Sequence, residues 1–192
     1  MTDVAIIFHS GYGHTRNQAE AVRDGAAAVV GVTPVLIAID QDGEISDAQW
    51  QQLDAASAII FGSPTYMGSV SWQFKRFADA SSKRWFNQVW KDKIAAGFTN
   101  SASLNGDKHS TLHYFMTLAM QHSMWWVGTG LMPSNTKAAQ RNDINYLGSF
   151  GGLMAQSPSD AGTDESPPPG DLATARAFGE RIAQISRRLE DG

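Results

Sequence analysis

The chain has 192 residues, of which 42 % are hydrophobic, with a net charge of −4 and no cysteine. A chain of this length can bury a sizeable core, so we expect one domain over residues 1–192. The lack of cysteine excludes disulfides, thiolate nucleophiles, iron–sulfur clusters and cysteine-ligated zinc. The 15 lysines and arginines are scattered, without the basic stripe that a nucleic acid backbone requires, so we expect no nucleic acid partner.

The beginning of the chain, MTDVAIIFHSG, has no basic region and its apolar stretch is too short for a signal peptide. No later apolar run approaches the ~20 residues that a membrane helix needs. We therefore expect no membrane contact and a cytoplasmic location.

Short apolar runs alternate with helical patterns along the chain. The expected strands are 4–8 (VAIIF), 35–39 (VLIAI), 58–64 (AIIFGSP, broken by Pro64), 94–98 (IAAGF) and the stretch 125–130 (WWVGTG). Apolar spacing predicts helices after Thr15, over 47–53, after Trp72, over about 108–122, and in the last segment, where Phe178, Ile182, Ile185 and Leu189 share a face.

Because parallel strands need crossover connections, this alternation predicts an α/β fold with a doubly wound, five-stranded parallel sheet between two helical layers. Ligands of such sheets bind beyond the carboxyl ends of the strands, here after residues 8, 63 and 98. Residues 131–169, rich in Gly, Ser, Asn, Pro and Asp, are expected to form a long loop excursion before the final helix.

The first strand is followed by SGYGHT, residues 10–15, and then by a helix. The N–H groups at a helix start and the helix dipole favour a phosphate there. No GxxxxGK string occurs, and a GxGxxG fingerprint that begins at Gly11 fails because Arg16 stands at its third glycine. Two interpretations remain: Ser10 and Thr15 cap the helix, or the loop wraps a monophosphate.

Two further loops favour the second interpretation. In GSPTYMG (62–68), Pro64 removes a donor, while Gly62 and Gly68 permit a backbone path close to a planar ring. The stretch TNSASLNGD (99–107) is again small and polar. Three such loops at one sheet edge point to a ligand site, in which backbone amides bind a cofactor.

The order of SGYGHT, SPTYMG, FTNSASLNG and QHSMWWVG resembles the WrbA-type NAD(P)H:quinone oxidoreductases, a flavodoxin-like family that binds FMN. The resemblance covers nearly the whole chain. It implies that residues 10–15 cradle the FMN phosphate, that residues 64–68 and 100–105 contact the flavin, and that His122 approaches the flavin pocket. It also implies that Trp85 and Tyr12 enclose the nicotinamide or quinone. The expected FMN residues are Ser10, Gly11, Tyr12, Gly13, His14, Thr15, Pro64, Thr65, Tyr66, Met67, Gly68, Asn100, Ser101, Ala102, Ser103, Leu104, Asn105 and His122.

The resemblance implies that hydride passes from NAD(P)H to FMN and that a quinone then takes two electrons at the same ring face. The cofactor supplies this chemistry, so we expect no catalytic side chain. His109 and His113 have the spacing of metal ligands, but no third ligand is evident and we expect no metal site. The family commonly forms oligomers, so we expect a homo-oligomer, a tetramer or a dimer.

Two alternatives remain. The first is a flavodoxin-like electron carrier, and the second is an FMN-dependent reductase of azo or nitro compounds or of free flavin. Carriers tend to be strongly acidic around the flavin, so that basic partners dock. The net charge of only −4, with Arg16, Lys75, Arg76, Lys83 and Arg84 near the expected loops, favours an enzyme.

Overall fold

The computed structural model of the protein describes residues 2–191. Its strands are β1 (Thr2–Phe8), β2 (Val32–Ala38), β3 (Ala58–Tyr66), β4 (Ser69–Val70), β5 (Ile94–Ser101), β6 (Trp125–Trp126) and β7 (Leu153–Gln156). Its helices are α1 (His14–Ala27), α2 (Asp47–Ala55), α3 (Trp72–Ala80), α4 (Ser82–Phe86), α5 (Lys108–Gln121) and α6 (Pro169–Asp191). None of the helices described is long and apolar enough to span a membrane.

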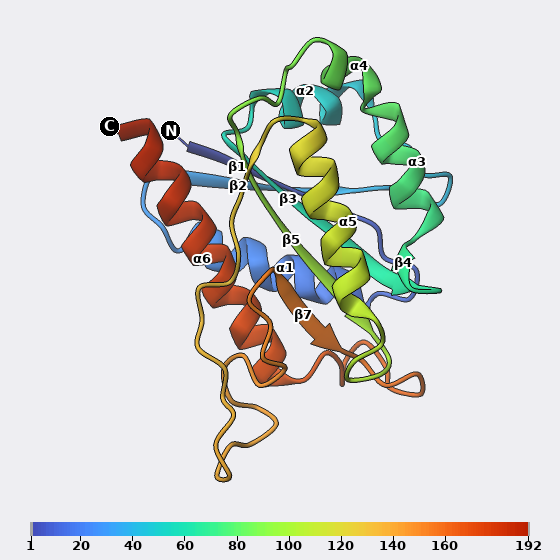
Figure 1. Cartoon of the computed structure of the whole chain (residues 1–192), viewed down its shortest axis with the longest axis vertical. Helices are drawn as coiled ribbons and strands as arrows, with labels where there is room; N and C mark the ends of the chain where they lie inside the picture. Colours follow the sequence, from blue (N-terminus) through green and yellow to red (C-terminus); the bar gives the residue numbers. More distant parts are fainter. Residues whose placement is uncertain (1, 192) are drawn as a thin grey trace.

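The strands form one sheet in the order β2-β1-β3-β5-β6 (Figure 1). All the pairs along this path are parallel, and only the short β4 runs antiparallel, as a hairpin with β3. This is the doubly wound order of the flavodoxin-like fold, with its topological switch point between β1 and β3. The predicted α/β flavodoxin-like fold is confirmed.

Two short strands share the fifth position of the sheet. β6 pairs with Ile94 and Ala95 at one end of β5, and β7 pairs with residues 98–101 at the other end. The expected strand over 125–130 is therefore wrong beyond Trp126, and the excursion expected over 131–169 contains the strand β7. The chain leaves the sheet after β6 and returns at its carboxyl edge, so the residues after β7 arrive beside the ends of β3 and β5.

The strands β3 and β5 are also longer than expected. Pro64 does not end β3, because β1 stops pairing at Gly62 while β3 continues beside β5 over Ser63 and Pro64, where Pro64 lies opposite Asn100. A strand tolerates proline where one of its sides is unpaired. Residues 99–101, expected in a loop, pair with β3 and β7 as part of β5.

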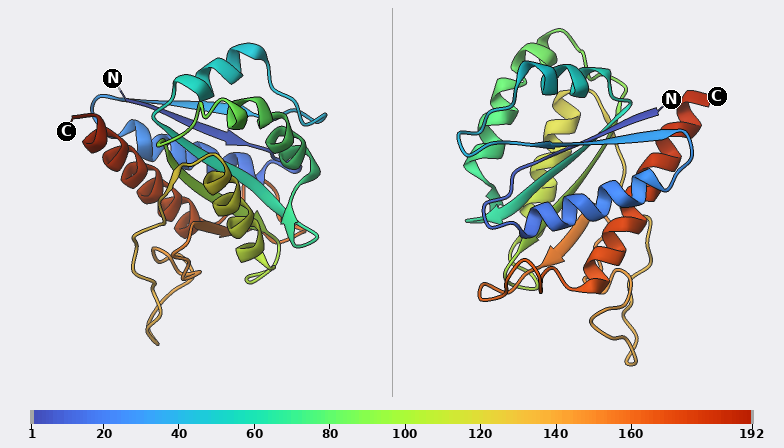
Figure 2. Two further views of the ribbon diagram at one scale, coloured as in Figure 1. Left: turned by 45° about the horizontal axis from the view of Figure 1, so that its top comes forward. Right: turned by 180° about the vertical axis from the view of Figure 1, so that it is seen from behind.

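The two faces of the sheet bury separate cores, visible as helical layers in Figure 2. Side chains alternate along β1: Val4, Ile6 and Phe8 face the layer of α1 and α6, while Ala5 and Ile7 face the layer of α2, α3 and α5. The predicted amphipathic face of the last helix is confirmed at the buried Phe178 and Ile182 and the partly buried Ile185, but it is wrong at Leu189, which is 52 % exposed near the end of the helix.

Helices α1 and α6 pack unusually closely at two glycines. A Cβ atom at Gly25 would lie 1.9 Å from the carbonyl oxygen of Arg176, and one at Gly179 would lie 1.9 Å from that of Val22. A side chain at either position would force the two helices apart. This contact fixes the C-terminal half of α1 against α6, while the helix begins at the carboxyl edge of β1.

We expect Gly179→Ala to lower the free energy of unfolding by about 1–2 kcal/mol, because an overpacking cost of about 1–3 kcal/mol exceeds the gain in helix propensity. Urea unfolding followed by circular dichroism measures this change. The control is Glu180→Ala on the exposed side of the same helix, which should leave stability within a few tenths of a kcal/mol. Equal stability of the two variants would contradict the close packing.

Candidate functional site

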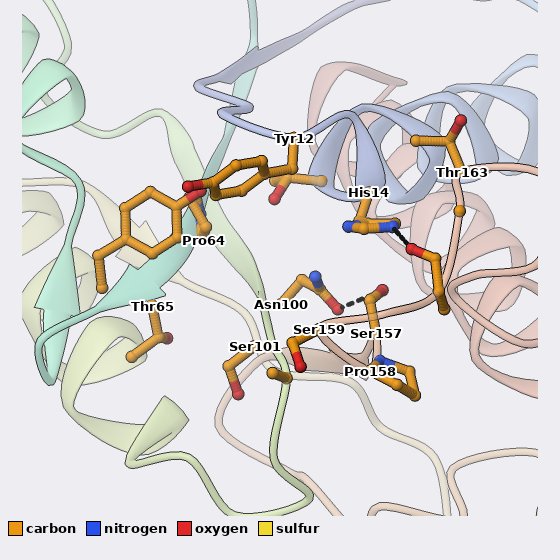
Figure 3. A pocket seen from close by; sticks show the side chains of 15 residues that line it. Tyr12, His14, Pro64, Thr65, Asn100, Ser101, Ser157, Pro158, Ser159 and Thr163 are labelled. Carbon is orange, nitrogen blue, oxygen red and sulfur yellow. Dashed lines mark hydrogen bonds between the residues drawn. The ribbon is translucent and has the colours of Figure 1, made fainter.

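A cavity of about 590 Å³ opens at the carboxyl edge of the sheet, at its switch point (Figure 3). Four segments form its walls: the β1–α1 loop, the end of β3, the end of β5 and the residues that follow β7. The lining residues are Tyr12, His14, Thr15, Pro64, Thr65, Tyr66, Asn100, Ser101, Ala102, Ser157, Pro158, Ser159, Ala161, Gly162 and Thr163. This volume suits a nucleotide-sized ligand.

The β1–α1 loop presents the start of helix α1 to this cavity. The Ser10 hydroxyl oxygen accepts the N–H groups of Gly13 at 3.1 Å and Arg16 at 3.2 Å. Gly13 adopts a φ of 94°, which glycine tolerates. Within residues 2–191, the N–H groups of His14 and Thr15 meet no acceptor. They remain as donors at the positive end of the helix dipole, which favours an anionic group.

The segment after β7 is fastened to helix α1. A ring nitrogen of His14 lies 3.0 Å from the carbonyl oxygen of Ala161, and the Asn17 amide donates to the carbonyl oxygen of Thr163 at 2.6 Å. The sequence interpretation missed these lining residues from Ser157 to Thr163 and treated them as part of the loop excursion. Their small polar composition is the only local signal, because their place depends on the pairing of β7 with β5.

Buried polar side chains fix the ends of β3 and β5. The hydroxyl group of Thr65 lies 2.8 Å from those of both Thr99 and Thr111. Asn100 is buried, and its Oδ1 accepts the hydroxyl group of Ser157 at 3.1 Å. Figure 3 shows the Asn100 side chain between the strand ends and the segment after β7. That hydrogen bond orients the carboxamide in the cavity wall.

Two tyrosines stand at the mouth of the cavity. Tyr12 is 79 % exposed and Tyr66 37 % exposed, and their rings meet edge to face with centroids 6.2 Å apart. Burial, and then the neighbouring Tyr12, raise the pKa of Tyr66, so the Tyr66 phenol is neutral near pH 7. The hairpin turn beyond Tyr66 has positive φ angles at Met67 (48°) and Gly68 (77°), as two-residue turns require.

These features fit a flavin mononucleotide. The free N–H donors of helix α1 suit a single phosphate, the polar strand ends suit a ribityl chain and a ring edge, and the mouth is aromatic. One detail of the sequence interpretation is wrong: Gly62 does not make room for a ring of the ligand. A Cβ atom there would lie 2.2 Å from the Phe98 ring, so this glycine serves core packing.

Nine of the expected site residues line the cavity: Tyr12, His14, Thr15, Pro64, Thr65, Tyr66, Asn100, Ser101 and Ala102. Eight others lie on the same loops but outside the lining: Ser10, Gly11, Gly13, Met67, Gly68, Ser103, Leu104 and Asn105.

The structure does not bring His122 to the cavity. Helix α5 carries the chain across the sheet, and its 14 residues span about 21 Å. His122 follows its last turn, where the ring lies 2.8 Å from the Ser81 hydroxyl group and packs on Trp90. Burial lowers the pKa of His122 to about 4, so it is a neutral packing residue.

Trp85 is likewise far from the cavity within the chain. It lies on α4, which Figure 1 places beside α2 at the opposite end of α3 from the β4 hairpin. Its side chain is 49 % exposed and does not line the cavity. The single chain does not bring Trp85 to the cavity, because α3 carries it away from the carboxyl edge, and its role in enclosing a substrate stays a prediction.

His109 and His113 lie together on α5 with ring centroids 6.5 Å apart. No group of three or more potential metal ligands forms among residues 2–191.

Comparison with known proteins agrees with this geometry. Residues 15–138 match the family model of the NADPH-dependent FMN reductases. Flavodoxin FldP of Pseudomonas aeruginosa is 50 % identical over 98 % of this chain and 99 % of its own. An NAD(P)H dehydrogenase (quinone) of Syntrophobacter fumaroxidans is 31 % identical over 97 % of this chain and 98 % of its own.

A solved structure, described as a flavodoxin, WrbA-like protein from Agrobacterium tumefaciens, superimposes with a TM-score of 0.76 and 47 % identity, over 98 % of this chain and 99 % of that one. An archaeal flavodoxin, 17 % identical, shares the fold with a TM-score of 0.66 over 97 % of this chain and 99 % of its own. The chain therefore belongs to the FMN reductase family, as a WrbA-type flavodoxin-like protein with FMN as its cofactor.

Proposed function

We propose that this protein is an oxidoreductase that passes hydride from NAD(P)H to FMN and then two electrons to a quinone. The observation that carries the proposal is the cavity at the switch point, which combines free helix N–H donors on the inside with an aromatic mouth. FMN bound there supplies the redox chemistry, because its ring accepts hydride and returns electrons.

The chain's own groups hold and orient the cofactor. In the proposed arrangement, the N–H groups of His14 and Thr15 bind the phosphate, while Asn100 and the backbone of residues 101–102 face the flavin. The segment 157–163 covers the side of the cavity opposite the β3 wall and limits the access of water. No side chain needs to act as a nucleophile or as a general acid.

The mouth provides a place for the second reactant. The Tyr12 ring is largely exposed and lies across from Tyr66, so a planar nicotinamide or quinone can pack against it. One mouth serves both, so the oxidised nucleotide leaves before the quinone binds. The relatives named NAD(P)H dehydrogenase (quinone), such as that of Syntrophobacter fumaroxidans, support this reaction.

An electron carrier is the second candidate, since the 50 % identical relative is named a flavodoxin. In the structure, the basic residues count less against a carrier than the sequence indicates. Lys75, Arg76 and Arg84 form ion pairs with Asp79, Glu44 and Asp54 on and around α3, α4 and α2. These charges are largely neutralised, so they do not decide between the two candidates. A reductase of azo or nitro compounds or of free flavin would use the same cavity.

We also propose a homo-oligomer, a dimer or a tetramer. The exposed apolar side chains Phe86, Met132 and Phe150 support it, because contacts between copies would remove them from water.

The purified protein, loaded with FMN, should oxidise NADH or NADPH in the presence of benzoquinone. Absorbance of the reduced nucleotide measures the rate, and nitroaromatic and azo acceptors tested in parallel define the preference. A yellow protein that oxidises neither nucleotide would support the carrier instead, and a protein that never retains flavin would contradict both.

Thr15→Val should weaken FMN binding about tenfold and leave riboflavin binding unchanged, because the lost hydroxyl group lies where the phosphate is proposed to bind. Quenching of flavin fluorescence measures both dissociation constants. The matched control is Thr117→Val on α5, whose hydroxyl group bonds to its own helix at the His113 carbonyl. Equal losses for FMN and riboflavin would place the phosphate elsewhere.

A further inference from the structure

Lys108, the first residue of α5, is completely buried. Its ammonium group donates to the Ser101 hydroxyl oxygen at 2.7 Å and to the Ser103 carbonyl oxygen at 2.5 Å. A buried cation is costly unless its donors are satisfied. Neither the fold nor the proposed reaction explains why a lysine, rather than an apolar residue, occupies this position.

The two acceptors of Lys108 belong to the wall of the cavity. Ser101 lines the cavity with Ala102, and Ser103 follows directly. The loop turns tightly around the ammonium group: a Cβ atom at Gly106, where φ is 52°, would lie 2.2 Å from the Ser101 hydroxyl oxygen. Lys108 therefore supports this wall from the side that faces away from the cavity.

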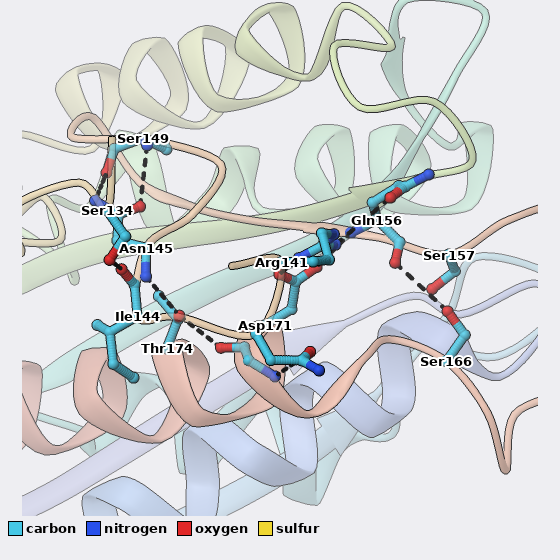
Figure 4. Close-up of polar contacts among 12 residues, drawn as sticks. Ser134, Arg141, Ile144, Asn145, Ser149, Gln156, Ser157, Ser166, Asp171 and Thr174 are labelled. Carbon is cyan, nitrogen blue, oxygen red and sulfur yellow. Dashed lines mark hydrogen bonds and ion pairs between the residues drawn. The ribbon is translucent and has the colours of Figure 1, made fainter. Parts of the chain in front are cut away.

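A second contact holds the same wall from β7. The Gln156 amide donates to the Ala102 carbonyl oxygen at 3.0 Å, and the Gln156 N–H donates to the Asp171 carboxylate at 2.9 Å. Asp171 in turn forms a two-point ion pair with Arg141, at 2.6 and 2.8 Å (Figure 4). The Asp171 carboxylate is thus bonded to Arg141 and Gln156. Lys108 bonds instead to the Ser101 hydroxyl oxygen and the Ser103 carbonyl oxygen.

The charge of Lys108 is sensitive to its surroundings. Burial lowers its pKa to about 8, with Asp171 acting to raise the pKa and Arg141 to lower it. These are the charged groups that face it from α6 and from the segment between β6 and β7, and Asp107 precedes it in the chain. Lys108 therefore changes from charged to neutral in the range just above neutral pH.

We propose that Lys108 is a positioning residue for FMN: its buried ammonium group holds the 101–103 wall in shape and adds positive charge behind it, so that the nucleotide binds more tightly when Lys108 is charged. This inference rests on the proposed placement of FMN in the cavity. It adds that the charge of Lys108, which does not itself line the cavity, controls how tightly the protein binds FMN.

The direction of the pH effect follows from linkage. An anionic ligand that prefers charged Lys108 raises the pKa of Lys108 when it binds. The affinity for FMN is then highest below the pKa of the free protein, about 8. It falls as the pH rises from that value to the higher pKa of the complex, above which Lys108 is neutral in both states.

The test measures the dissociation constant of FMN in four proteins. The pH runs from about 6 to about 9.5, a range that brackets the titration of Lys108. The four proteins are the wild type, Lys108→Arg, Lys108→Met and Lys93→Met. Lys93 is a matched control, because it is another lysine with a pKa lowered by burial, and its ammonium group donates to the carbonyl oxygens of Asp54 and Ala56 in the segment that ends α2. The ionisation of FMN itself is common to all four profiles.

We expect the wild type and Lys93→Met to lose affinity above about pH 8, by on the order of tenfold. Lys108→Arg keeps the charge, so it should bind FMN as tightly as the wild type at neutral pH and keep this affinity above about pH 8. Lys108→Met should bind FMN about tenfold more weakly than the wild type at neutral pH. Its affinity should not fall further above about pH 8.

The same loss of affinity in Lys108→Arg as in the wild type would overturn the inference, since another group would then titrate. Circular dichroism reports whether each variant folds, and if Lys108→Met does not, the wild type and Lys108→Arg still decide. If FMN fails to bind, or binds without any dependence on Thr15, the proposed function fails instead. These outcomes separate the two claims.

Discussion

The pairing of β7 with β5 is the constraint on which the site depends. β5 is fully buried over most of its length, and β7 adds a strand to its outer side only at the carboxyl end. That pairing delivers residues 157–163 to helix α1, where they meet His14 and Asn17. Without it, the β1–α1 loop and the ends of β3 and β5 would form an open edge and not a cavity.

Much of the fold and part of the site could be predicted because their signals are local. A buried parallel strand appears in the sequence as a short apolar run. The apolar face of helix α6 appears as the helical spacing of residues such as Phe178 and Ile182, which are buried. Once the sheet is parallel, the loops after β1, β3 and β5 must meet at one edge. This is why the sequence predicts Tyr12, Thr15 and Asn100 at this edge, and all three line the cavity.

The rest depends on contacts that a sequence pattern does not contain. The resemblance places His122 and Trp85 near the flavin, but helices α5 and α3 carry them to the far edge of the sheet within the chain. β7 has only four residues, too few for a periodic signal. Lys108 reads as an ordinary helix-start lysine, and only the fold of the 101–107 loop around it reveals that it is buried.

A crystal structure of the complex with FMN tests the central claim most directly, namely that the cavity at the switch point holds the cofactor. We expect the phosphate on the N–H groups of His14 and Thr15, the ring between Asn100 and the two tyrosines of the mouth, and Lys108 still bonded to Ser101. Density for FMN at any other place, or a phosphate that points away from α1, would contradict it.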